Sequence, residues 1–125
     1  MTAFIPRKNS EIDRDEIPPG TLYLLILKML AVHGTLHGYE IAEGIERTSD
    51  DVLQVEEGSL YPALQRMLLK GWVTAEWGVT EGNRRARYYR LTSLGRKQLH
   101  AEMEQYNRVS LAIQKVLHLA GGEVS

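Results

Sequence analysis

The chain of 125 residues contains no cysteine. Disulfide bonds, thiol catalysis and cysteine-based zinc sites are therefore excluded, and the composition suits a reducing cytoplasm. Long apolar runs are also missing, because the longest one, residues 22–32, is interrupted by Lys28 and falls short of the ~18 residues that a transmembrane helix needs. Residues 1–10 lack the apolar core of a signal peptide. We expect a cytoplasmic protein without membrane contact.

The sequence motifs of common enzymes are absent as well. There is no glycine-rich phosphate loop, no nucleophile elbow and no HExxH pair. His33 and His37 lie four residues apart, but Gly34 interrupts the helix that would align them, and no further ligands follow at a fitting spacing. We therefore expect no enzymatic activity, no metal and no cofactor.

Charge is distributed unevenly, although the net charge is only −1. Residues 1–57 carry 5 Lys/Arg and 11 Asp/Glu, whereas residues 58–97 carry 8 Lys/Arg and 2 Asp/Glu. A basic middle third in an otherwise acidic chain is typical of a nucleic-acid-binding surface. A solvated charged face is the alternative interpretation.

Hydrophobic periodicity predicts three short helices after a polar N-terminal arm, residues 1–18. Apolar residues at i, i+3, i+4, i+7 and i+8 predict a helix from about Pro19 to His33, and a second should run over residues 38–47. A third should begin near Ser59, with Ser59 or Gly58 at its N-cap and Pro62 in its first turn, and end at Gly71. Residues 52–55 between them are either a short strand or an extended connector.

After Gly71 the period of the hydrophobic pattern changes from 3.6 residues, typical of a helix, to 2, typical of a strand. Residues 72–77 and 87–91 alternate as two strands around a turn whose tip is residues 81–83, which predicts a β-hairpin. Thr92 or Ser93 should cap a last helix. That helix carries apolar residues at a/d heptad spacing, which predicts a helix-helix seam; the seam residues are Leu99, Met103, Tyr106, Ser110, Ile113 and Leu117.

Three helices followed by a hairpin are the layout of a winged helix-turn-helix domain. We therefore predict a mainly α fold with a small β-hairpin: an arm over residues 1–18, a DNA-binding domain over residues 19–92 and one long C-terminal helix over residues 93–120. A domain this small has no room to cover the seam, so a second copy of the chain is its simplest partner. The predicted assembly is a homodimer joined by the last helix.

In a helix-turn-helix protein the second helix of the motif enters the major groove with its N-terminal residues first. Here that helix is the third, where Ser59 suits a phosphate contact at the helix start. Tyr61 cannot share the face of the buried leucines and should point partly outward, while Gln65 and Arg66 are placed one turn later to reach base edges. The alternative is that Tyr61 only packs at the helix start and that Gln65 is merely solvated.

The hairpin tip is strongly basic. Arg is suited to bidentate phosphate contacts and to a narrow minor groove, and the candidates for DNA contact are Asn83, Arg84, Arg85 and Arg87, with Arg90 close by. Strand alternation should place Arg85 and Arg87 on one face, with Arg84 and Tyr88 on the other. A charge run that only protects an exposed strand edge is the alternative.

Four motifs in order resemble the PadR family. They are HGYEI at residues 37–41, EGSLYPAL at residues 57–64, KGWV at residues 70–73, and RYYRLT at residues 87–92 followed by Gly95. The resemblance spans about residues 20–100. The long arm and the lack of a tryptophan in the last helix depart from some relatives.

The resemblance implies a repressor that binds a palindromic operator on double-stranded DNA as a homodimer through its C-terminal helix. It places Ser59, Tyr61 and the wing arginines 84, 85 and 87 at DNA-contacting positions, and it places Tyr39 between the second and third helices. Some members release DNA on binding a small aromatic effector between the subunits, where Met103, Tyr106 and Ile113 would line a pocket here. Two alternatives remain open: a ligand-responsive module with secondary DNA binding, and a winged helix used only for protein contacts.

Overall fold

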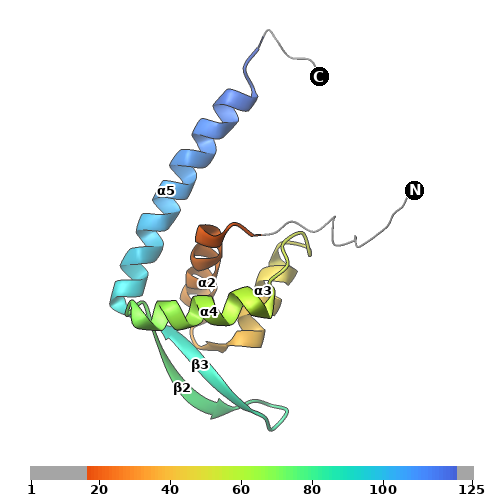
Figure 1. Ribbon diagram of the computed structural model, residues 1–125, viewed down its shortest axis with the longest axis vertical. Coiled ribbons are helices and arrows are strands. Elements are labelled where there is room, and N and C mark those ends of the chain that lie inside the picture. Colours follow the sequence, from red (N-terminus) through yellow and green to blue (C-terminus); the bar gives the residue numbers. More distant parts are fainter. Residues whose placement is uncertain (1–16, 121–125) are drawn as a thin grey trace, which may run out of the picture.

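The computed structural model describes residues 17–120 (Figure 1). Its elements follow the predicted order, with one additional strand: α2 (Pro19–His33), β1 (Leu36–His37), α3 (Gly38–Thr48), α4 (Glu57–Leu69), β2 (Val73–Val79), β3 (Arg85–Leu91) and α5 (Ser93–Leu117). The predicted arm, residues 1–18, lies almost entirely outside the described residues. None of the helices in the described part combines the length and hydropathy needed to cross a bilayer.

The core forms where α2 meets α3, α4 and the base of the hairpin. The apolar stripe of α2 supplies Ile26, Leu27 and Leu30, which are almost completely buried. Against them pack Ile41 from α3 and Leu64 from α4, which are fully buried. Burial of such side chains stabilises the fold by about 1.5–3 kcal/mol each relative to exposure. These contacts hold α4 firmly on the surface of the domain.

The sheet has three strands rather than the predicted two. Its order is β1-β3-β2, and both pairs are antiparallel. The unpredicted strand β1 has only two residues, which face Tyr89 and Tyr88 of β3. Two residues are too short to show a period in the sequence, so this strand is defined only by its pairing. The fold is otherwise the predicted one, mainly helical with a small β-hairpin.

Of the two alternatives for residues 52–55, the extended connector is the observed one. Asp50 and Asp51 turn the chain after α3 with φ values of 53° and 65°, a left-handed conformation in which Asp is enriched. The Leu53 N–H donates to Ser49 Oγ at 3.1 Å, and the Val55 N–H donates to a Glu46 carboxylate oxygen at 2.9 Å. Side chains of α3 thus hold the segment that leads into α4.

Helix α4 begins two residues earlier than predicted, at Glu57 with Glu56 as its N-cap residue. Pro62 therefore lies in the second turn, not the first, and removes one bond of the helical ladder. The predicted end is confirmed, because Gly71 follows the C-cap with a φ of 77°. A left-handed residue at this position is the common way to end a helix.

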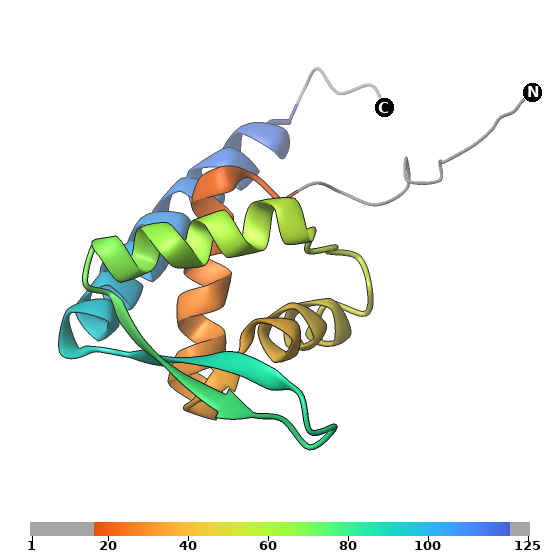
Figure 2. The same ribbon diagram turned by 60° about the horizontal axis from the view of Figure 1, so that its bottom comes forward.

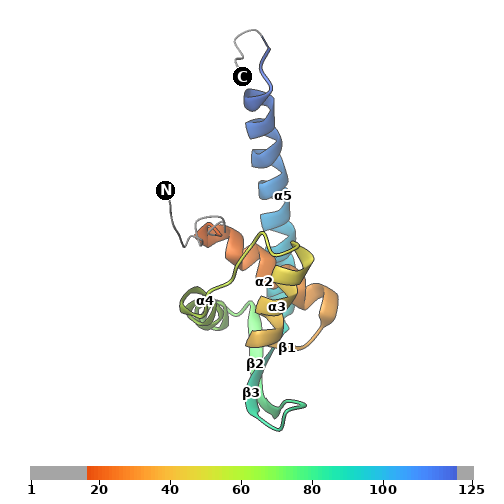
Figure 3. The same cartoon turned by 90° about the vertical axis from the view of Figure 1, so that its right-hand side faces the viewer.

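Helix α5 leaves the domain at a tight junction. Thr92 caps it as predicted: its hydroxyl oxygen accepts from the Gly95 N–H at 3.0 Å. Leu99 is buried against the domain and Met103 packs partly against it, and the C-terminal part of the helix projects away from the other elements (Figures 1 and 3). The helix ends at Leu117, before residue 120 where we predicted its end.

Candidate nucleic-acid interface

The outer face of α4 is open to solvent. Leu60, Ala63, Leu64 and Met67 are buried on its inner side. A helix turns by 100° per residue, so Gly58, Pro62, Gln65 and Leu69 come to lie opposite them, and all four are exposed. Gln65 therefore occupies the centre of the outer face, where a groove of DNA would meet it.

Tyr61 lies at the edge of this outer face, next to α3. Its side chain is 45% exposed, yet its ring packs so closely on Gly38 that an added Cβ there would lie 2.7 Å from the ring. Both interpretations of Tyr61 thus describe part of its environment. The position expected for Tyr39 is wrong: it is 67% exposed and stacks on His37 rather than packing α3 against α4.

Ser59 is not at the N-cap of α4, because the helix begins at Glu57. The Ser59 N–H donates to the Glu56 carbonyl at 3.0 Å, so it is already engaged. Glu57 also places a carboxylate in the first turn, which complements the helix dipole and repels a phosphate. Ser59 therefore offers a phosphate only its exposed side chain, not an N-cap position at the helix start.

Arg66 points to the side of α4 rather than outward with Gln65. Its Nε donates to the Tyr23 hydroxyl at 2.5 Å, and its guanidinium lies 5.9 Å from the centre of the Tyr23 ring. Together with Ser59 it lines a cleft of about 460 Å³ between the N-terminal halves of α2 and α4. Gln65 and Arg66 were both expected to reach base edges, and of the two only Gln65 lies on the outer face.

One face of the hairpin carries the arginines that we predicted to share it. Alternation along β2 and β3 puts Arg85 and Arg87 on the same face as Val73, Tyr89 and Leu91, which are buried at the base of the hairpin. Toward the tip the helices no longer cover this face, and the arginines are exposed or partly exposed. We call this surface the arginine face of the hairpin.

Sequence analysis missed Trp77, which lies on the arginine face directly opposite Arg87. Its side chain is 59% exposed. The Arg85 guanidinium carbon is 4.5 Å from the centre of its ring and that of Arg87 is 5.8 Å away. These distances are those of cation-π contacts. The register that joins the three residues depends on the length of the turn, which the sequence pattern left open.

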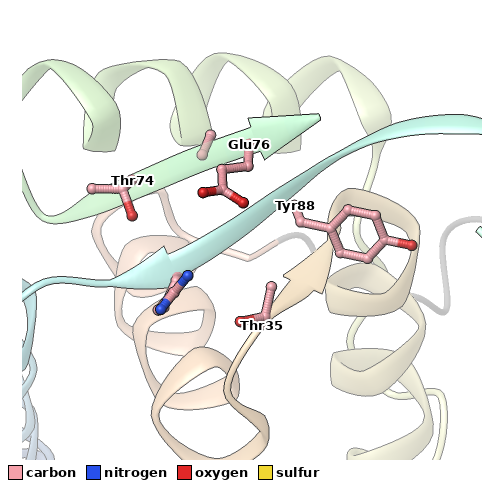
Figure 4. Close-up of a pocket in the computed structure, with 6 residues that line it drawn as sticks. Thr35, Thr74, Glu76 and Tyr88 are labelled. Atoms are coloured by element: carbon pink, nitrogen blue, oxygen red, sulfur yellow. The ribbon is translucent and has the colours of Figure 1, made fainter. Parts of the chain in front are cut away.

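The opposite face of the hairpin has a different character. Thr74, Glu76 and Tyr88 lie there beside Thr35 (Figure 4), together with Arg90. They enclose a space of about 20 Å³, room for about one water molecule. Glu76 brings a negative charge to this face, so the arginine face is the better match for a phosphate backbone.

The turn between the strands carries the two remaining wing candidates. Asn83 has a φ of 62°, a conformation that Asn tolerates well. Arg84 follows it and is exposed. Its N–H donates to Thr80 Oγ1 at 3.2 Å, and its carbonyl accepts from the Thr80 N–H at 2.8 Å. The tip is therefore a closed turn, and Arg84 extends from it.

Tyr89 connects the arginine face with α4. Burial raises the pKa of its hydroxyl above the usual value, while the positive charge of nearby Arg87 lowers it and nearby Tyr61 adds to the increase. The hydroxyl therefore remains neutral at physiological pH. Tyr89 itself is buried in the core, and beyond it the hairpin projects below α4 (Figure 2).

The seam on α5 divides into two parts. Leu99 is buried in the core of this same chain, and Met103 packs against that core but stays partly exposed. Ser110 is half-buried. The part of the seam that stays uncovered is C-terminal, and its large exposed apolar residues are Tyr106, Ile113 and Leu117, flanked by Val109 and Val116.

Within residues 17–120, no three His, Cys, Asp or Glu side chains lie together in a way that would hold a metal ion. His37 is engaged otherwise. Its backbone N–H donates to a Glu40 carboxylate oxygen at 3.0 Å, and its ring meets the Tyr88 ring edge-on with 5.2 Å between the ring centres. It therefore supports the start of α3 and the back of the sheet.

Comparisons with known proteins identify relatives across most of the chain. A family model described as "Transcriptional regulator PadR-like family" matches residues 26–101. An uncharacterized protein of Lysinibacillus sphaericus is 33% identical over 97 residues, which cover 77% of this chain and 87% of the relative. A solved transcriptional regulator from Clostridium thermocellum is 30% identical with a TM-score of 0.69, covering 77% of this chain and 92% of the other. A solved PadR-like transcriptional regulator from Bacillus cereus is 25% identical with a TM-score of 0.67, covering 80% of this chain and 94% of the other.

Proposed function

The chain belongs to the PadR-like family of transcriptional regulators, and on this premise we propose that it binds double-stranded DNA as a homodimer through α4 and the hairpin. One observation carries the proposal: α4 has an exposed outer face, and the hairpin that follows it presents Arg85 and Arg87 at the uncovered end of a face whose base, at Tyr89 and Leu91, is buried in the same core as α4. A helix and a basic wing on one surface fit a major groove and the phosphates beside it.

Within this proposal α4 reads bases and the hairpin holds the backbone. Gln65 is the best placed reader, because it lies at the centre of the outer face and a Gln amide pairs with the edge of adenine. Tyr61 reaches a phosphate from the side of the helix. The proposed backbone contacts of the wing come from Asn83, Arg84, Arg85 and Arg87, and Ser59 and Arg66 add contacts only at the flank of α4.

Dimerisation is proposed through the uncovered part of α5. A cluster of exposed apolar side chains on a projecting helix is unfavourable in water unless another surface covers it. A second copy of the same helix covers it with matching heptad spacing. The two α4 helices of such a dimer would lie about 34–36 Å apart on one side of the DNA, which requires a palindromic site.

We further propose that the regulator represses its target genes, as its resemblance to the family suggests. A DNA-bound dimer of this size would occlude the promoter. Release of DNA by a small aromatic effector is a further part of the proposal: Tyr106 and Ile113, two of the expected lining residues, lie on the exposed part of α5 that the partner would cover. A reporter gene behind the operator tests the sign of regulation, since deletion of the regulator should raise expression.

The test of DNA binding is a salt titration on purified protein. The operator is selected first from a pool of random duplexes, and its Kd is then measured at several salt concentrations beside a scrambled duplex of equal length. Each lost phosphate contact reduces the slope of log K against log salt by about 0.9. A dimer carries two copies of each side chain, so Arg85→Ala and Arg87→Ala should each lower the slope by about 1.8.

Arg90→Ala is the matched control, since Arg90 lies on the same strand but on the opposite face. It removes the same charge and should leave the slope almost unchanged. If Arg85→Ala and Arg87→Ala kept the same slope of log K against log salt as Arg90→Ala, the arginine face would not meet DNA. Equally weak binding to selected and scrambled duplexes would favour a winged helix that contacts proteins instead.

A further inference from the structure

The exposed tryptophan of the hairpin has no packing role that explains it. Trp77 is 59% exposed on the arginine face, where a smaller polar residue would satisfy the strand equally well. Exposed large aromatic side chains in a functional surface usually contribute to binding. Its neighbours on this face are the two arginines of the proposed wing contact, Arg85 and Arg87.

We propose that Trp77 is a positioning residue for DNA binding, whose ring holds the guanidinium groups of Arg85 and Arg87 in place before DNA arrives. The inference rests on the proposed function and deepens it. Arg87 faces Trp77 directly across the strands, and Arg85 lies diagonally, two residues nearer the tip. The ring therefore contacts both guanidinium groups: its centre is 4.5 Å from the guanidinium carbon of Arg85 and 5.8 Å from that of Arg87.

A ring is suited to this task because it restrains an arginine without using up its donors. A guanidinium stacked on a ring keeps its N–H groups at its edge, where they can still bind a phosphate. A carboxylate partner would occupy those donors instead and cancel the charge. Among the ion pairs of residues 17–120, none involves Arg85 or Arg87.

The effect of the ring is entropic and electrostatic, so its loss has a particular signature. An unrestrained arginine loses rotamer freedom when it binds DNA, whereas a restrained one has lost much of it beforehand. An exposed cation-π pair corresponds to about a two- to five-fold change in an equilibrium constant. Both guanidinium charges remain when the ring is removed, so the number of phosphate contacts stays the same.

The experiment compares Trp77→Leu and Trp77→Phe with the wild-type protein on the selected operator. Leu keeps apolar bulk but has no ring, and Phe keeps a ring. We expect Trp77→Leu to raise Kd about five-fold with an unchanged salt slope, and to lower the unfolding midpoint only slightly, since the lost contacts are exposed. Trp77→Phe should recover most of the affinity. A fall in the salt slope of Trp77→Leu would overturn the proposal.

A variant that lacks both arginines separates positioning from direct contact. In the Arg85→Ala, Arg87→Ala background, Trp77→Leu should have no further effect on Kd, because the ring then has nothing to position. A loss that persists in this background would show that the ring touches DNA itself, which would overturn the proposal.

An NMR measurement on the protein without DNA separates this inference from the proposed function. The ring should shift the side-chain Hδ and Hε resonances of Arg85 upfield, and Trp77→Leu should abolish that shift. The shift would remain even if the wild-type protein bound no DNA and the proposed function failed. Random-coil resonances in the wild-type protein would overturn the positioning role even if DNA binding were strong.

Discussion

Gly95 is the position where a single methyl group should cost the most. It lies in the first turn of α5, and an added Cβ would come within 2.1 Å of the Trp72 carbonyl oxygen and 2.9 Å of a Leu91 methyl group. The carbonyl cannot swing away cheaply, because it accepts the Thr92 N–H at 3.0 Å and shares the Thr92 hydroxyl proton, at 3.1 Å, with the Gly71 carbonyl at 2.6 Å. Gly95→Ala must therefore displace backbone.

The expected loss of stability follows from three contributions. Overpacking of a close contact costs about 1–3 kcal/mol. Weakening the two bonds to the Trp72 carbonyl costs about 1 kcal/mol each. Replacing a helical glycine by alanine returns about 0.5–1 kcal/mol. Gly95→Ala should therefore lower the free energy of unfolding by roughly 2–4 kcal/mol, a large part of what a small domain has.

The assay is urea unfolding followed by circular dichroism, at one protein concentration because dimerisation contributes to stability. Gly20→Ala is the matched control: Gly20 is also helical, but nothing lies within 4 Å of an added Cβ. It should leave stability unchanged or raise it by about 0.5–1 kcal/mol. If Gly95→Ala unfolded at the same midpoint as Gly20→Ala, the close approach of α5 to the hairpin base would be refuted.

Three further predictions concern the site and its supports. Gly38→Ala should push aside the Tyr61 ring and weaken operator binding about ten-fold, the size of one lost hydrogen bond to a charged group. In a binding titration, Tyr61→Ala added to this variant should cause no further loss of affinity. Ile113→Glu should weaken the dimer at least ~100-fold by ultracentrifugation because it buries an unpaired charge, whereas Lys115→Glu, on the other side of α5, should not. Thr92→Ala should lower thermal stability by about 1–2 kcal/mol through loss of the cap, and Thr92→Ser, which keeps the hydroxyl, should behave like the wild type.

Local chemistry was enough to predict most of the elements. The apolar spacing in residues 22–30 predicts the helix α2, and the change of hydrophobic period after Gly71 marks the hairpin. Thr92 could be identified as a cap because a hydroxyl before a helix satisfies a backbone N–H. Such features depend on neighbours within a turn or a strand, which the sequence contains.

Side-chain directions on α4 were less accessible. The connector before Glu57, where the helix begins, is held by Glu46 of α3, a contact over nine residues that no local pattern shows. That start shifts Ser59 into the first turn and Pro62 into the second. Arg66 is likewise directed by Tyr23, which is 43 residues away in the chain.

The basic wing was predictable as a composition, and its geometry was not. The sequence alone determined that arginines gather at residues 84–90, that three helices precede them and that α5 carries a heptad seam. Only the tertiary structure decided that Trp77 lies under Arg85 and Arg87, and that Leu99 belongs to this chain's own core while Ile113 remains uncovered. The physical reason is that composition and periodicity are local, whereas strand register and helix docking are set by contacts between distant residues.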